Sequence, residues 1–398
     1  MAQIKKYIYP NPVILIGGDH HNGLNLARIF GINGFKVFCC VISNDRSTLI
    51  QHSRYVQNVK VFREESLAYD YLENSISDFE HKPVLIPYSD GAAMELDRRL
   101  NSFVGKYYVP SINEEQGAIV KMMDKNAQYL WAKENGIPMA FSMVLDVCSF
   151  SEEMALDIPL PCIIKPIVSA TGKKLDIVIC NTNIEVKEAL SELKDKKYHN
   201  VLVQEYLIKD YEIDVFGCIC KNDPQILLVP TKTLRTWPLK TGTNSFSQIL
   251  ADDSTINNCK SIISKLKDAG FYGLYDIELM VVNGTYYLNE INYRNSGDDY
   301  MALNQGFYYP VVWTKEVLGI VQEISLDHPQ KETYAMTEFF DRNNIKQGIL
   351  SRGDWKKDYR RTSDFALKFK GDMKPVFWFY SHRVFNKIKR MINKMLSK

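Results

Sequence analysis

Three oxygen-bearing side chains with the spacing E-x₁₁-E-x-N are the strongest candidates for metal chemistry in the sequence. They lie in a β-rich stretch, 275–297, where Asn283-Gly284 separates two runs rich in β-branched and aromatic residues. Such a dipeptide between two such runs predicts a β-hairpin. Carboxylate and amide oxygens are hard ligands that suit Mg²⁺ or Mn²⁺. The candidate ligands are Glu278, Glu290 and Asn292.

The length of the hairpin loop decides which of these residues share a face. A two-residue loop would set Glu278 opposite Asn289, whereas a three-residue loop would set it opposite Glu290. In the second register Asn292 lies two residues further along the same face, and Arg294 two further still. A solvated hairpin face with scattered charges is the alternative.

A lysine ends an apolar run earlier in the chain. Lys165 follows Cys162-Ile163-Ile164 and precedes a loop of small residues, VSATGKK (168–174). A buried lysine needs a partner, and a phosphate is a natural one. Backbone N–H groups of the loop would cover further phosphate oxygens. The spacing is not that of a Walker A loop, and a lysine that reaches the surface at a strand end is the alternative.

Two acidic residues flank a break between strands in LVQEYLIKDYEIDV (202–215). A short extended linker can bind the edge of an adenine through its backbone, while a nearby carboxylate binds the ribose hydroxyls. Glu205 and Glu212 are placed for this role. Two ordinary strands with solvent-facing acids are the alternative.

The order of these features, with Lys125 ahead of them, resembles the ATP-grasp superfamily, which includes D-alanine–D-alanine ligase, biotin carboxylase and carbamoyl-phosphate synthetase. The resemblance is strongest to D-aspartate-ligase-like carboxylate–amine ligases and covers about residues 12–318. Its specific part is the hairpin pattern E-x₁₁-E-x-N-x-R, which ends at Arg294.

The resemblance implies a role for each matching residue. It assigns ATP to Lys125, Lys165, Ser169, Thr171, Gly172, Lys173, Gln204, Glu205, Leu207 and Glu212, and magnesium to Glu278, Glu290 and Asn292. Residues 169–173 would form a flap over the phosphates, although this segment has one glycine where many members have several. Arg294 would be the catalytic residue that steadies the acyl phosphate and the tetrahedral intermediate.

The activity that the resemblance implies is the joining of a small-molecule carboxylate to an amine, with ATP and Mg²⁺ (or Mn²⁺) as cofactors. Phosphorylation converts the carboxylate oxygen into a leaving group, and phosphoryl transfer requires mainly positioning and charge neutralisation. The products are an amide, ADP and phosphate. A bicarbonate-activating enzyme of the biotin-carboxylase or carbamoyl-phosphate-synthetase kind is an alternative.

A glycine-containing turn near the N-terminus, IGGDHHNGLNLAR (16–28), offers a dinucleotide-dependent oxidoreductase as another alternative. Its glycines do not fit G-x-G-x-x-G, and His20-His21 would place bulk where a pyrophosphate approaches. The resemblance instead gives this domain a part in the acceptor site, with Gly18 and Asn22 as candidate substrate residues. Arg235, in the loop 231–245, is a third candidate, and a plain solvated loop is its alternative.

Short apolar runs at 13–18, 37–42 and 84–89 alternate with helical spacing, which predicts an α/β unit with a parallel sheet. With the resemblance, we expect an N-terminal parallel-sheet (pre-ATP-grasp) domain followed by two α+β lobes. The expected boundaries are 1–112 for this domain, 113–198 for the first lobe with its flap, 199–325 for the second lobe with hinge and metal site, and 326–398 for a C-terminal extension. One helix is expected over 113–136.

Composition limits the location and the partners. The 398 residues are 45% hydrophobic and 24% charged, which is ordinary for a globular protein, and the net charge of +2 does not indicate nucleic-acid binding. The eight cysteines form no CxxC pair, which favours reduced core thiols. The N-terminus, MAQIKKYIYPNP, lacks the long apolar stretch of a signal peptide, and no run in the sequence has the length of a spanning helix, so a cytoplasmic location is expected.

The last stretch of the chain is basic and amphipathic. From Lys374 to Lys398 there are seven basic residues and no acidic one, and apolar and basic stripes alternate at helical spacing. This pattern is typical of an interfacial helix on an anionic membrane. A helix that docks on the enzyme body or on a second subunit, as in a homodimer, is the alternative.

Overall fold

The computed structural model describes residues 7–149, 158–166, 177–239, 242–322, 324 and 326–396, and the side chains as far as Phe385. The chain divides into two compact units. The first consists of Met1–Val120, Asp214–Asp276 and Asn292–Lys398, and the second of Lys121–Ile213 and Ile277–Ile291. The finer division into four consecutive segments stays a prediction.

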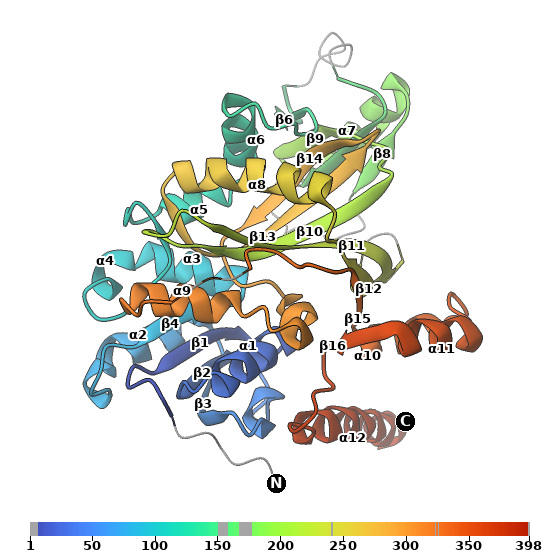
Figure 1. Cartoon of the computed structure of the whole chain (residues 1–398). Coiled ribbons are helices and arrows are strands. Elements are labelled where there is room, and N and C mark those ends of the chain that lie inside the picture. Colours follow the sequence, from blue (N-terminus) through green and yellow to red (C-terminus); the bar gives the residue numbers. More distant parts are fainter. Residues whose placement is uncertain are drawn as a thin grey trace. The chain divides into compact units, whose positions relative to one another are not determined.

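The N-terminal part of the first unit is a four-stranded parallel sheet in the order β3-β2-β1-β4 (Figure 1). Successive residues of β1 belong to different apolar clusters, Val13 and Leu15 to one and Ile14 and Ile16 to the other. Both faces of the sheet are therefore covered, as expected for a parallel sheet. Its elements are β1 (Val13–Gly18), α1 (His21–Ile32), β2 (Val37–Ile42), η1 (Ile50–His52), β3 (Val56–Phe62), α2 (Glu65–Asn74), η2 (Ile76–Asp78), β4 (Val84–Pro87), α3 (Asp90–Arg98) and α4 (Leu100–Phe103).

A second, largely antiparallel sheet has the strand order β14-β13-β10-β11-β12-β15-β16, and β5 also pairs with β13. Helix α8 packs on β11, and α9 packs on α1. The elements are β5 (Ser111–Ile112), β10 (Tyr211–Ile219), β11 (Ile226–Trp237), β12 (Thr243–Ile249), α8 (Asp253–Asp268), β13 (Phe271–Val282), β14 (Thr285–Asn292), η5 (Asp299–Gln305), α9 (Tyr309–Val317), β15 (Thr333–Met336) and β16 (Thr362–Phe365).

The second unit is built around an antiparallel sheet in the order β6-β9-β7-β8. One face of it packs on α7 through an apolar cluster that includes Val186, Leu190, Ile164 and Val203. The elements are β6 (Ser142–Asp146), β7 (Cys162–Pro166), β8 (Val178–Cys180), α7 (Asn183–Asp195) and β9 (Asn200–Glu205).

The expected single helix over 113–136 is wrong. The structure has two helices there, α5 (Ala118–Met122) and α6 (Lys125–Glu134). Asn113 and Gly117 have positive φ, which delays the start of the first helix. Asp124 then caps the second helix by accepting a hydrogen bond from the backbone of Ala127 at 2.9 Å.

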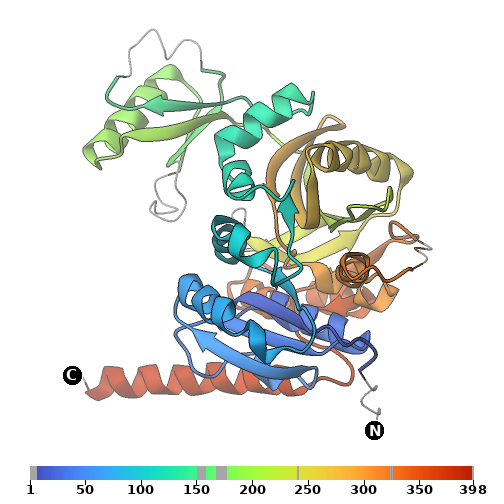
Figure 2. The ribbon, with the colours of Figure 1, turned by 90° about the vertical axis from the view of Figure 1, so that its left-hand side faces the viewer.

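The last part of the chain has three further helices. Between β15 and β16 lie α10 (Glu338–Lys346) and α11 (Arg352–Arg361), and after β16 comes α12 (Lys374–Leu396). Figure 2 shows α12 as a single long helix. Its start is anchored in the first unit, because Val376 is buried and Trp378 stacks on His52 at 5.0 Å. Just before α12, Asp372 forms a buried ion pair with Arg28, in which Arg28 Nε lies 3.0 Å from Asp372 Oδ2. None of the helices in the described part of the chain is long and apolar enough to span a bilayer.

Candidate functional site

Helix α6 carries the first of the predicted phosphate-binding lysines in the second unit. Lys125 is its first residue, and its Nζ lies 3.9 Å from Glu290 Oε2 on β14. One turn later Gln128, only 1% exposed, exchanges two hydrogen bonds with the backbone of Ile291. The Gln128–Ile291 hydrogen bonds join α6 to β14 beside Glu290 and so hold Lys125 near Glu290. Sequence reasoning missed Gln128, since an isolated glutamine in a helix has no spacing signal.

Lys165 lies at the end of β7, as predicted. Cys162 and Ile164 face the core of the second unit, so Lys165 faces the opposite side of its sheet. Its Nζ donates a hydrogen bond to Gln204 Oε1 at 2.9 Å. Gln204 Nε2 in turn donates to Ser142 Oγ at 2.9 Å, which fixes the amide's orientation.

Lys165 loses its proton more readily than an exposed lysine does. Burial, and then the like charge of Lys125, lower the pKa of Lys165 to about 8, while Glu290 acts in the opposite direction. Two lysines and a glutamate thus come within electrostatic range of one another in the second unit. Two ammonium groups beside one carboxylate leave an excess of positive charge, so the site is suited to a phosphate.

The predicted adenine hinge follows β9. Glu205 Oε2 accepts a hydrogen bond from the backbone of Phe141 at 3.3 Å, and Leu207 is half-buried in the linker before β10. Glu212, near the start of β10, forms an ion pair with Lys209. The predicted flap residues, Ser169, Thr171, Gly172 and Lys173, lie outside the described residues.

The hairpin has the shorter of the two predicted loops. Asn283 and Gly284 alone connect β13 to β14, with φ values of 49° and 78°. Two left-handed residues in succession make a type I′ turn, so the register that sets Glu278 opposite Glu290 does not form. Glu278 accepts a hydrogen bond from Asn289 at 3.0 Å.

Hard oxygen donors for a divalent cation are nevertheless present at the hairpin. Glu290 is partly exposed beside Lys125, whereas Asn292, two residues further along β14, is 4% exposed. The described residues contain no group of three acidic, histidine or cysteine side chains that would hold a metal unaided. Mg²⁺ bound to a nucleotide needs only one or two protein carboxylates, so this donor set fits it.

Arg294 belongs to the first unit, where it binds two carboxylates. Its Nε donates to Asp90 Oδ1 at 2.9 Å, and its Nη1 donates to Asp276. Burial would lower the pKa of Arg294, but Asp276 and Asp90 together raise it. Burial also raises the pKa of the nearby Asp298 carboxyl to about 7.

The glycine turn before α1 is filled by a side chain of the chain itself. A Cβ on Gly17 or Gly23 would lie 2.6 or 2.7 Å from the ring of Tyr88. These glycines make room for tyrosine, and a dinucleotide cannot lie against them there. A Cβ on Gly18 would meet no atom within 4 Å, so the backbone at that candidate substrate residue is open.

Asn22 has a structural role in the first unit. Its amide Nδ2 donates to the carbonyls of Tyr88 and Asn295, both at 3.0 Å, and its Oδ1 accepts from Asn295 at 2.7 Å. The residue therefore joins the turn to the loop after Arg294. Its hydrogen-bonding groups are used by the protein rather than by a substrate.

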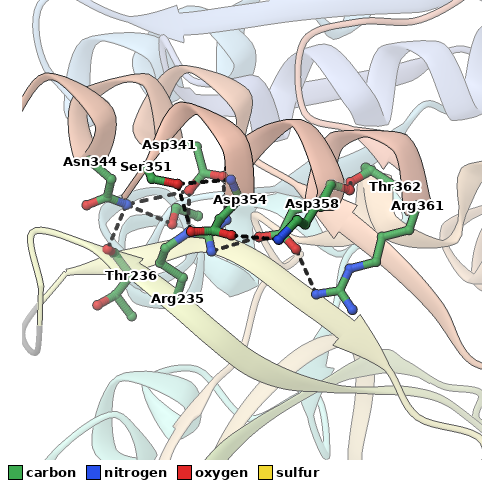
Figure 3. A network of polar contacts seen from close by, with 11 residues as sticks. Arg235, Thr236, Asp341, Asn344, Ser351, Asp354, Asp358, Arg361 and Thr362 are labelled. Atoms are coloured by element: carbon green, nitrogen blue, oxygen red, sulfur yellow. Dashed lines mark hydrogen bonds and ion pairs between the residues drawn. The ribbon is translucent and has the colours of Figure 1, made fainter. Parts of the chain in front are cut away.

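Arg235 also has partners within the protein (Figure 3). It makes two hydrogen bonds to the buried Asp341, at 2.8 and 2.7 Å, and a third to Asp358 at 3.0 Å. These contacts join β11 to α10 and α11. The prediction of a substrate role does not agree with this geometry, because the side chain of Asp341, which holds two of the guanidinium nitrogens, is fully buried. Arg294 differs, since its partner Asp90 is half-exposed.

No family model matches the sequence. Over 285 residues the chain is 20% identical to the formate-dependent phosphoribosylglycinamide formyltransferase of Shewanella frigidimarina, with 70% of this chain and 69% of that protein covered.

Two solved structures have a similar fold. The N5-carboxyaminoimidazole synthetase of Staphylococcus aureus, complexed with ADP, has a TM-score of 0.62 at 14% identity, with 83% of this chain and 82% of that chain covered. The L-amino acid ligase of Bacillus licheniformis has a TM-score of 0.59 at 13% identity, with 82% and 79% covered. These similarities confirm the predicted ATP-grasp fold.

Proposed function

We propose that this chain, with its ATP-grasp fold, is an ATP- and Mg²⁺-dependent ligase that activates a carboxylate as an acyl phosphate and joins it to an amine. The observation that carries the proposal is the approach of Lys125, Lys165 and Glu290 in the second unit. Two ammonium groups fit the anionic oxygens of a triphosphate, and the carboxylate beside them fits the cation that accompanies ATP.

The nucleotide would be held by the second unit. Lys125 and Lys165 would bind its phosphates, and Gln204 would keep the Lys165 ammonium oriented. The adenine would lie along the linker that follows Glu205. Glu212 would give up its ion pair with Lys209 and accept hydrogen bonds from the ribose hydroxyls. Glu290 and Asn292, two residues apart on one face of β14, would hold Mg²⁺, which supplies charge neutralisation for phosphoryl transfer when bound. Glu278, the third predicted ligand, is paired with Asn289 instead and is left out of this set.

The acid and the amine would react in two steps. The carboxylate oxygen attacks the γ-phosphorus of ATP and ADP leaves, which gives an acyl phosphate. The amine nitrogen then attacks the acyl carbon, loses a proton, and expels phosphate to leave an amide. Arg294, kept positively charged by Asp276 and Asp90, would stabilise the negative oxygens of both steps.

The comparisons support this reaction class. One similar protein is named as a formyltransferase that depends on formate, another as an amino acid ligase, and a third as a synthetase solved with ADP. An enzyme that activates a small acid with ATP is consistent with all three names. The acceptor would contact the first unit around Gly18 and Arg294.

We also propose a cytoplasmic enzyme whose helix α12 contacts an anionic membrane from one side. The support is its basic, acid-free sequence from Lys374 onward and its exposed apolar side chains, Phe377, Val384 and Phe385. Pairing of two copies through the same helix is the second possibility for this face.

The test is to incubate the purified protein with Mg-ATP and pools of amino acids, small carboxylates and bicarbonate. Release of ADP and phosphate that depends on an added acid is expected. Hydroxylamine would then trap the acyl phosphate as a hydroxamate and identify the acid, while dependence on bicarbonate alone would indicate the bicarbonate-activating alternative. Formation of AMP and pyrophosphate would contradict the proposal.

A further inference from the structure

A cavity of about 800 Å³ lies in the C-terminal part of the first unit, where α10, α11 and the start of α12 meet. This part of the chain lies beyond the predicted ATP-grasp region. The lining residues comprise five cations, five apolar or aromatic residues and one amide: Arg342, Lys346, Arg352, Lys356, Arg383, Phe339, Ile345, Trp355, Tyr380, Val384 and Asn343.

The positive charge of this cavity is not balanced by the protein. Within the described residues, none of its five cations has a carboxylate partner within 4.0 Å. The residues in question are Arg342, Lys346, Arg352, Lys356 and Arg383. All five are exposed, so their charges lie at the rim. Like charges gathered on a rim repel one another and attract an anion.

The acids of α10 and α11 are used elsewhere. Asp341 and Asp358 bind Arg235, and Asp354 binds Ser351 and Lys357 (Figure 3). The remaining acid of these helices, Glu338, is buried and accepts hydrogen bonds from the backbone of residues 367 and 368. The network therefore leaves the cations on the cavity side of the helices without acidic neighbours.

The inner lining of the cavity is apolar. Phe339 is 8% exposed, whereas Val384 on α12 is 59% exposed and is followed by the exposed Phe385. Two lining residues also carry buried donors without a partner among the described residues, the indole N–H of Trp355 and the hydroxyl of Tyr380. Such groups are rarely left unpaired in proteins, which is consistent with a ligand that offers acceptors.

We propose that this cavity binds the phosphate-bearing head of an anionic phospholipid. The rim cations would bind the phosphate oxygens, and the first part of the lipid chain would lie on Phe339 and Val384. A small soluble anion would bind the rim cations but would not cover the apolar lining. A phospholipid would contact both, so the apolar lining favours a lipid. The inference rests on the membrane contact proposed above and gives that contact a site and a ligand.

The experiment measures binding of the full chain to vesicles of phosphatidylcholine, with and without an equal part of phosphatidylglycerol. Binding only to the anionic vesicles is expected. The double variant Lys346→Gln/Lys356→Gln should weaken that binding on the order of tenfold, because each basic residue near an anionic surface contributes measurably. Both side chains are exposed, so folding should not change, which a thermal melt verifies.

The matched control removes the same charge outside the cavity. Arg360→Gln/Lys370→Gln changes two exposed basic residues that do not line it and should reduce binding much less. If both variants lost vesicle binding equally, the attraction to the membrane would be spread over the whole basic surface. That result would overturn lipid binding in the cavity but not the membrane contact itself. Absence of any vesicle binding would overturn both proposals, and ADP release with soluble substrates would still test the ligase separately.

The source of the anion is tested by competition. Glycerol phosphate and inorganic phosphate should compete with anionic vesicles only weakly, since they lack the apolar part. Quenching of tryptophan fluorescence by brominated phosphatidylglycerol should fall in Trp355→Phe, which places the lipid at the cavity. Tight binding of glycerol phosphate, or quenching that Trp355→Phe does not alter, would exclude the lipid.

Discussion

The side chain of Gln128 binds the backbone of Ile291 in both directions, donating to its carbonyl at 2.9 Å and accepting from its N–H at 3.0 Å. Strand β14 ends its sheet, so its outer edge has backbone groups with no neighbouring strand. A primary amide has the donor and acceptor that such an edge needs. Because Lys125 precedes Gln128 by one turn and Glu290 precedes Ile291, this contact sets the two charged groups together.

The variant Gln128→Ala should therefore weaken both the fold and the nucleotide site. It leaves a buried N–H and a buried carbonyl unpaired, which should lower the free energy of unfolding by about 2–3 kcal/mol. The dissociation constant of ATP should rise, because Lys125 is no longer held. Denaturant unfolding and calorimetry measure the two effects. Lys133→Ala, an exposed residue of the same helix, is the control and should change neither.

Glu290→Gln should abolish turnover in a folded protein. The amide keeps the size of the side chain but removes the charge that would bind Mg²⁺, so we expect kcat to fall by at least about 100-fold. The free energy of unfolding should change by less than about 1 kcal/mol, since the ion pair with Lys125 is partly exposed. Glu134→Gln on α6 is the matched control. Full activity of Glu290→Gln would remove this residue from the site.

The elements of the fold were predictable where local chemistry decides them. The strands at 13–18 and 37–42 follow from continuous apolar runs, and the hairpin follows from Asn283-Gly284. The length of the hairpin loop did not follow from the sequence, because Asn-Gly is compatible with more than one loop. Its register depends on the backbone angles of two residues, which the structure supplies.

The site was less predictable because its geometry depends on contacts between distant segments. The partnership of Lys165 with Gln204 joins residues 39 positions apart, and spacing along one strand gives no sign of it. The partners of Arg235 were hidden for the same reason. Its partners, Asp341 and Asp358, are more than 100 residues away, in a segment whose sequence has few recognisable signals.

ATP binding should weaken above neutral pH because Lys165 loses its proton early. The pKa of this lysine is about 8, since burial and the charge of Lys125 disfavour its ammonium form. ATP binds the protonated form, so the affinity should be constant below that pH and fall by up to about tenfold per pH unit above it. Calorimetric titration of ATP across this range measures the effect.

Deprotonation of Lys165 does not cause such a loss by unfolding the protein. The folded pKa of Lys165 lies below the unfolded value of 10.5, so between about 8 and 10.5 the unfolded chain binds more protons at this residue. Its contribution to the free energy of unfolding therefore increases as the pH rises. Lys165→Arg is the control, because arginine stays charged and should remove the pH dependence even if it binds ATP less well. An unchanged pH profile in that variant would assign the titration to another group.

Arg235→Met should destabilise the first unit without a direct effect on substrate binding. The substitution leaves Asp341, whose side chain is fully buried, without its bidentate partner. Loss of one member of a buried ion pair costs about 3–5 kcal/mol, since the remaining charge is desolvated. Denaturant unfolding should show this loss, and Lys357→Met, which breaks only an exposed pair with Asp354, should show less than about 1 kcal/mol. The double variant Arg235→Met/Asp341→Asn should recover part of the stability because it removes the orphaned charge. A substrate role would give the opposite pattern: a rise in KM for the acid, little change in unfolding, and no rescue by the second substitution.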